Sequence, residues 1–133
     1  MIMKVRLKQQ HARYAKSHDL TPGNTYRVIG IEADDYRLLD DAGRPYLHGA
    51  RWFEVIDPTE PADWQTRYGD DGERYSYPAV LNRVGFFEDY FDDVSAAILA
   101  FNTYLEGRSR ITLADKPPPR RPRKAAERDS AAA

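Results

Sequence analysis

The chain has 133 residues, of which 41% are apolar and 31% are charged, and it contains no cysteine. These figures predict a hydrophilic globular protein and exclude disulfides and thiolate metal sites. No apolar run approaches the roughly 18 residues that a membrane span requires. The N-terminus alternates charged and apolar residues where a signal peptide would be continuously apolar. We therefore expect a cytoplasmic protein.

The formal net charge of -1 conceals a strong asymmetry along the chain. Residues 1–30 carry six Lys and Arg against one Asp, and residues 107–133 carry eight against three acids, a net charge of +5 for each. Residues 31–106 carry 17 acids against six arginines, a net charge of -11. Charge separated in this way bears on partners and association rates rather than on the fold. The middle of the chain is expected to favour a basic partner.

The first third of the chain predicts strands joined by a loop and a turn. Apolar residues at every second position of 2–8 are typical of a half-buried strand, and residues 9–19 are interpreted as a polar loop. A Thr-Pro-Gly-Asn turn occupies 21–24. The strand expected at 25–33 changes its in/out parity, which predicts a β-bulge near Val28–Gly30.

A hairpin and a further strand are expected next. Residues 36–48 predict two short strands joined by an Asp-Asp-Ala-Gly turn with glycine in the left-handed position. Pro45 cannot donate a ladder hydrogen bond, which predicts an edge strand or a bulge. A bend at 49–50 would lead into a strand at 51–56. Several short, bent antiparallel strands in fewer than 60 residues favour a small barrel.

The run KVR…LTPGNTYRVIGIEADDYRLLDDAGRPYLHGARWFEVID, at about residues 3–57, resembles the small SH3-like barrel proteins common in bacteria and phages. The resemblance lies in the basic first strand, the LTPGNTYRV entry, the YRLLDDAG hairpin and the closing FEVID strand. It implies an SH3-like antiparallel barrel and says little about activity, because such barrels bind many unrelated ligands.

The following residues combine aromatic and acidic side chains. Residues 61–68 predict one or two helical turns that begin at a proline. An exposed acidic loop is expected at 69–72, followed by a short edge strand at 73–78. Residues 86–93 contain four aromatics and four acids.

The clearest predicted helix spans about 94–106 and packs on the barrel. Asp92 or Asp93 would cap its N-terminus, and Gly107 would end it in the left-handed conformation. A short strand could follow at 108–113. The buried stripe of the helix is expected to consist of Val94, Ile98, Phe101 and Leu105. We expect residues 1–114 to form a single mainly β (α+β) domain, and the Pro/Arg/Ala-rich tail at 115–133 to be disordered.

No catalytic or cofactor motif occurs in the chain. His11, His18 and His48 lack metal-ligand spacing and are interpreted as surface residues. Adjacent carboxylates such as Asp34/Asp35 and Asp40/Asp41 are explained by turns. Nucleophile and phosphate-loop motifs are absent from the sequence. We therefore expect no enzyme, no metal and no cofactor.

The acidic, aromatic middle of the chain instead predicts a binding surface, because Tyr beside charge is typical of interface hot spots. The hypothesis is a non-enzymatic module that engages a basic protein, in its most concrete form an immunity protein that inhibits a bacterial toxin. The partner-binding residues are predicted to be Glu88, Asp89, Tyr90, Asp92 and Asp93, then Asp70, Asp71, Glu73, Tyr75 and Tyr77.

Two alternatives remain open at this point. An accessory nucleic-acid-binding protein would use the basic N-terminal strand and the tail at 116–133. An enzyme would need the carboxylates of 70–93 to converge in one pocket with raised pKa values.

Overall fold

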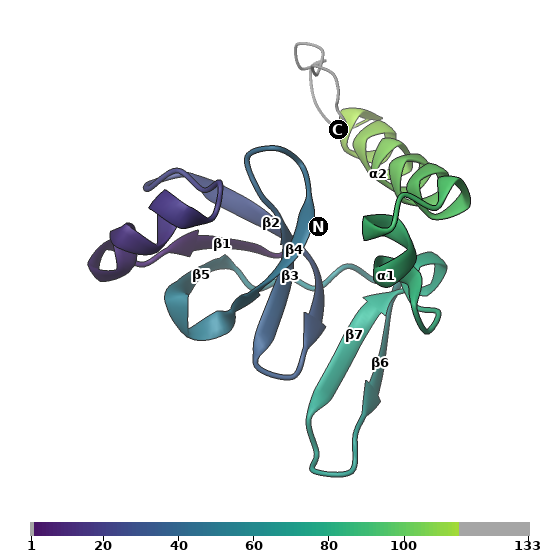
Figure 1. Cartoon of the computed structure of the whole chain (residues 1–133), viewed down its shortest axis with the longest axis horizontal. Coiled ribbons are helices and arrows are strands. Elements are labelled where there is room, and N and C mark those ends of the chain that lie inside the picture. Colours follow the sequence, from purple (N-terminus) through teal and green to yellow (C-terminus); the bar gives the residue numbers. More distant parts are fainter. Residues whose placement is uncertain (1, 115–133) are drawn as a thin grey trace. The chain divides into compact units, whose positions relative to one another are not determined.

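The computed structural model describes residues 2–114, with side chains to residue 107 (Figure 1). Contacts divide the described chain into an N-terminal unit, residues 2–78, and a C-terminal unit that begins at Ala79. The N-terminal unit holds all seven described strands, and the C-terminal unit holds the helices α1 and α2. Each unit is described by itself. The predicted tail at 115–133 lies outside the described residues.

The strands of the N-terminal unit form one antiparallel sheet. They are β1 (Lys4–Leu7), β2 (Thr25–Glu32), β3 (Asp35–Leu39), β4 (Pro45–Gly49), β5 (Phe53–Asp57), β6 (Trp64–Tyr68) and β7 (Arg74–Pro78). The main path runs β4-β3-β2-β1-β5, and β7 pairs with both β2 and β6. β4 and β5 stand at the two ends of this path, so the described sheet is not closed. The structure thus supports an α+β protein dominated by antiparallel sheet.

Several local predictions are confirmed. Val5 and Leu7 are buried in β1, and Met3, the residue before this strand, is buried as well. The register of the β2–β3 pair shifts between Val28 and Gly30, where the change of parity predicted a bulge.

The hairpin features are confirmed as well. Gly43 has a φ of 76° in the β3–β4 turn, in which the Asp40 carbonyl accepts a hydrogen bond from Gly43 N. Pro45 begins the edge strand β4.

Other predictions for the N-terminal unit are wrong. Residues predicted as a polar loop form the 3₁₀ helix η1 (Gln9–Ser17), and a second, short 3₁₀ helix, η2 (Ala50–Trp52), precedes β5. The predicted helical turns at 61–68 are replaced by β6. β7 is interior to the sheet rather than at its edge, because it has partners on both sides.

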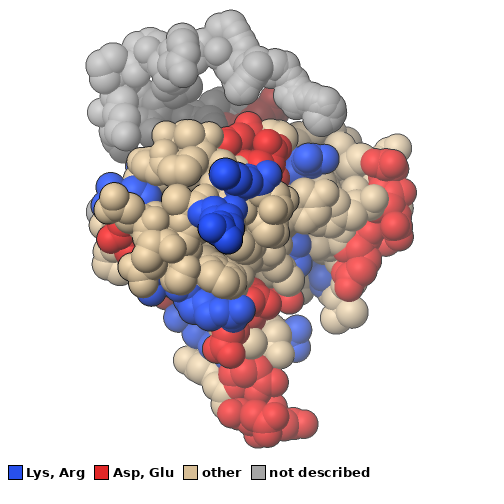
Figure 2. All heavy atoms as spheres, turned by 60° about the vertical axis from the view of Figure 1, so that its left-hand side comes forward, with Lys and Arg blue, Asp and Glu red and all other residues tan. Residues whose placement is uncertain are grey.

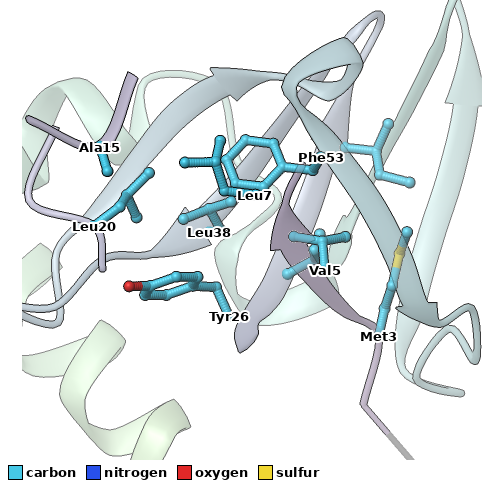
Figure 3. Close-up of a cluster of buried hydrophobic side chains, with 10 residues drawn as sticks. Met3, Val5, Leu7, Ala15, Leu20, Tyr26, Leu38 and Phe53 are labelled. Carbon is cyan, nitrogen blue, oxygen red and sulfur yellow. The ribbon is translucent and has the colours of Figure 1, made fainter. Parts of the chain in front are cut away.

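The core of the N-terminal unit gathers side chains from β1, η1, β2, β3 and β5 (Figure 3). Its buried members are Met3, Val5, Leu7, Ala15, Leu20, Tyr26, Val28, Ile31, Leu38 and Phe53. Four partly buried aromatics pack against it: Tyr14, Tyr36, Trp52 and Trp64.

The C-terminal unit contains the 3₁₀ helix η3 (Ala79–Leu81), α1 (Phe86–Phe91) and α2 (Ser95–Ala114). Within this unit α2 contacts both α1 and η3. Its core is aromatic: the Phe101 ring lies 6.2 Å from Phe87 and 5.0 Å from Tyr90 between centroids. Docking of this helix on the sheet stays a prediction.

The limits and the buried stripe of α2 differ from the prediction. The helix continues through Gly107 to Ala114, so Gly107 is not a C-cap and the strand at 108–113 is wrong. Neither Asp92 nor Asp93 begins α2, because the carbonyl of Val94 accepts its first hydrogen bonds, from Ala97 N and Ile98 N. The stripe contains buried Ala97 and Phe101, whereas Val94 is exposed.

Candidate interaction surfaces

The predicted partner-binding residues fall on two elements. Asp70, Asp71, Glu73, Tyr75 and Tyr77 belong to the β6–β7 hairpin of the N-terminal unit, and Glu88, Asp89, Tyr90, Asp92 and Asp93 belong to α1 and the turn that follows it. Because the two groups lie in different units, each is described on its own.

The tip of the β6–β7 hairpin is acidic and carries an exposed tyrosine. The turn closes through hydrogen bonds from Gly69 N to the Glu73 carbonyl, 2.8 Å, and from Gly72 N to the Gly69 carbonyl, 3.0 Å. Tyr68 is 69% exposed beside this turn. Asp70 and Asp71 are exposed, and neither has an ion-pair partner within residues 2–107. The acidic tip is visible at the bottom of Figure 2. We call Tyr68, Asp70, Asp71 and Glu73 the hairpin tip.

Glu73 organises this turn. Its Oε1 accepts a hydrogen bond from Asp71 N at 3.0 Å, and its Oε2 accepts one from the Tyr75 hydroxyl at 3.3 Å. Hydrogen bonds from backbone N–H groups of the turn hold the pKa of the Glu73 carboxyl below its usual value. Glu73 therefore keeps its negative charge at neutral pH.

A buried polar network fixes the base of the hairpin to the sheet. The Tyr77 hydroxyl donates to Glu32 Oε2 at 2.5 Å and accepts from Arg37 Nε at 2.7 Å. Arg37 also donates to Glu32 Oε2 at 3.0 Å and to the Pro45 carbonyl at 2.8 Å. Burial raises the pKa of Tyr77 well above its usual value, so the phenol stays protonated. Tyr77 is therefore placed inside the fold, where it orients the hairpin.

The second acidic surface lies on α1 and its following turn. Glu88, Asp92 and Asp93 are exposed and have no ion-pair partner in the described part of the chain. Asp93 adopts a φ of 62°, a left-handed conformation that Asp tolerates better than most residues. Asp89 instead pairs with Arg83 at 2.8 Å, and Tyr90 is half-buried against Phe101. Of the five predicted residues on this surface, Glu88, Asp92 and Asp93 therefore carry exposed carboxylates that have no ion-pair partner among the described residues.

A cluster of histidine and aromatic side chains, which no sequence pattern indicated, joins η1 to β4. The Tyr14 ring stacks on His18, with centroids 3.8 Å apart, and on Trp52, 5.1 Å apart. Its hydroxyl shares a hydrogen bond of 2.8 Å with His48 Nδ1.

His48 contradicts its interpretation as a surface residue, because it is 4% exposed. Its Nε2 is buried without a hydrogen-bond partner. The neighbours of His48 in the sequence, Leu47 and Gly49, do not indicate this burial. The burial is explained by the register of β3 and β4, which places His48 opposite Tyr36.

Two further observations concern possible metal ligands and membrane spans in the described part of the chain. Within this part of the chain no three His, Cys, Asp or Glu side chains are grouped as metal ligands would be. No described helix is long and apolar enough to cross a membrane. The basic strand proposed for nucleic acid is partly neutralised, since Arg6 pairs with Glu54 at 3.1 Å.

Comparison of the chain with known protein families, with curated proteins and with solved structures gave no match.

Proposed function

We propose that this protein is a non-enzymatic binding protein that engages a basic protein through the hairpin tip, with the surface of Glu88, Asp92 and Asp93 as a second contact. One observation carries the proposal: Asp70 and Asp71 are exposed without an ion-pair partner among the described residues, beside a tyrosine that is 69% exposed. The most concrete version is an immunity protein that blocks a basic bacterial toxin.

The physical basis is electrostatic attraction combined with an aromatic anchor. Carboxylates without internal partners attract a basic partner at long range and accelerate its association. Tyrosine then contributes a rigid apolar contact with a polar end, which is why it is enriched at hot spots. The buried contact of Tyr77 with Glu32 and Arg37 holds the base of the hairpin in a defined position before binding.

Affinity capture followed by kinetics tests this function. The full chain, immobilised and exposed to lysate of its native host, should retain a basic protein, which is then identified and purified. The variant D70N/D71N should lower its association rate about tenfold at low salt. D34N/D35N is the matched control, because it removes the same charge from a different turn and should bind like the wild type.

Two results would contradict the proposal. One is failure of the wild-type chain to bind any basic protein with saturation. The other is an equal loss of association rate in D70N/D71N and in D34N/D35N, which would indicate net charge rather than a defined surface. The immunity version further requires a toxin gene directly before the gene for this protein.

We also propose that residues 3–57 adopt an SH3-like barrel and that the protein acts in the cytoplasm. The sheet path β4-β3-β2-β1-β5 and the short 3₁₀ helix before β5 support a small, strongly bent sheet of this kind. The barrel would then serve as the scaffold from which the β6–β7 hairpin extends.

A further inference from the structure

A groove lies beside η1 in the N-terminal unit. Two hollows of about 500 Å³ and 400 Å³ share the side chains of Ala12 and Pro22. The lining of the first hollow is mainly apolar and includes Ala15 and Leu20, whereas the second hollow is mixed and includes Leu7; all three residues are also members of the buried core. Figure 3 shows Ala15 and Leu20 next to each other at one end of that core. We call the two hollows together the basic groove.

Four cations line the basic groove, two in each hollow. Arg13 and Lys16 border the first hollow, and Arg6 and Lys8 border the second. Glu54 is the one acidic lining residue, and Arg6 already pairs with it. Figure 2 brings this side of the N-terminal unit forward and shows Lys and Arg gathered on it.

Three of the four cations of the groove have no ion-pair partner among the described residues. Arg37, Arg44, Arg74 and Arg83 each pair with a carboxylate. Lys8, Arg13 and Lys16 have no carboxylate within ion-pair distance in the described residues. Three unpaired cations around an apolar concavity form a surface that is complementary to a ligand both acidic and apolar.

We propose that the basic groove binds an acidic peptide segment of a partner protein, in which carboxylates flank an apolar side chain. The apolar side chain would enter at Ala12 and Pro22, which both hollows share, and the carboxylates would reach Arg13 and Lys16 on one side and Lys8 on the other. An apolar concave floor suits a peptide better than a nucleic-acid backbone, whose charged phosphates gain nothing from apolar contact. This site is independent of the acidic surfaces that the proposed function uses.

Fluorescence anisotropy with labelled eight-residue peptides tests the groove. One peptide set alternates Asp or Glu with Leu or Val, and the second set replaces the acids by Asn or Gln. The wild-type chain should bind the acidic set with saturation and not the amide set. The variant R13E/K16E should weaken binding about tenfold or more. K4E/R51E is the matched control, because it reverses one Lys and one Arg outside the groove.

A steric variant separates the groove from general electrostatic attraction. A12W leaves the charge unchanged and fills the wall that the hollows share, so it should abolish peptide binding while the far-ultraviolet circular dichroism remains that of the wild type. The proposal is overturned if no acidic peptide saturates the protein. Equal losses of peptide affinity in K4E/R51E and R13E/K16E would overturn it as well. So would a short DNA duplex or anionic vesicles that bind the wild type but not R13E/K16E, if the acidic peptides do not bind.

Discussion

Gly30 of β2 lies directly against the ring of Tyr77 in the hairpin. A Cβ atom added to Gly30 would overlap ring carbons of Tyr77, so the absence of a side chain at residue 30 allows the Tyr77 ring to lie against the sheet. The same ring carries the hydroxyl that bonds Glu32 and Arg37. The lack of a side chain at Gly30 therefore determines how the base of the β6–β7 hairpin packs against β2.

The variant G30A should lower the free energy of unfolding by about 1–3 kcal/mol, the usual cost of forcing an extra group into a packed site. Urea unfolding followed by fluorescence measures this change. Because Gly30 does not have a positive φ, the loss would reflect steric overlap rather than backbone strain. A stability equal to that of the wild type would show that the Tyr77 ring can move without cost.

His48 makes stability depend on pH. Burial, followed by the charge of nearby His18, lowers the pKa of His48 from 6.5 to about 4. The unfolded chain therefore binds a proton below pH 6.5 that the folded chain does not bind until about pH 4. The contribution of His48 to stability is fully retained above pH 6.5 and is lost as the pH falls toward 4, by about 3 kcal/mol in total.

The variant H48Q should remove this pH dependence. The unfolding free energy of the wild type minus that of H48Q should decrease as the pH is lowered from 6.5 to 4, whatever the difference at neutral pH. H11Q is the matched control, because His11 packs edge-on against the other side of the same cluster, at Trp52. A wild-type-minus-H48Q difference that stays constant over this range would contradict the burial of the His48 ring.

Sequence patterns predicted a structural feature correctly when that feature depends on a few adjacent residues. The parity change at Val28–Gly30 and the glycine of the β3–β4 turn express backbone requirements of a few adjacent residues, and both were predicted correctly. The segment 61–68 was predicted as helix because Pro61 suits a helix start. It forms β6 because β7 offers a full antiparallel ladder, from Trp64 opposite Pro78 to Tyr68 opposite Arg74.

The residues of the candidate sites also fall into two groups, those that a local pattern predicts and those that depend on the whole fold. Acidic turn residues such as Asp70 and Asp71 are exposed, as their turn pattern indicated. The burial of Tyr77 and His48 depends on β2, β3 and β7 coming together, which no local window contains. Whether a carboxylate lies near Arg13 or Lys16 likewise depends on how distant parts of the chain come together, and no local sequence pattern predicts it.

The continuation of α2 through Gly107 is a property of the helix that one substitution can test. Gly107 has open space around its Cα and lies inside the helix. Alanine is the better helix former, so G107A should raise the free energy of unfolding of the C-terminal unit by about 0.5–1 kcal/mol. Thermal denaturation followed at 222 nm measures the gain. A decrease would instead indicate that Gly107 ends the helix in the left-handed conformation, as the sequence pattern favoured.

At the scale of the whole molecule, each unit contains buried apolar residues of its own. The core cluster of the N-terminal unit lies entirely within residues 3–53, and every described strand pairs with another strand of this unit. In the C-terminal unit, the Phe101 ring of α2 contacts the rings of Phe87 and Tyr90 of α1. Folding of one unit is therefore expected not to require the other.

A chain that ends at Pro78 should fold by itself, because it retains the complete sheet and the Tyr77 network. Its urea unfolding should be a single cooperative transition, and its amide protons in β1–β3 should remain protected from exchange. The same chain carrying G30A is the control, since it should unfold at a lower urea concentration by the amount seen in the full chain. A shortened chain without a cooperative transition would mean that the sheet depends on the C-terminal unit.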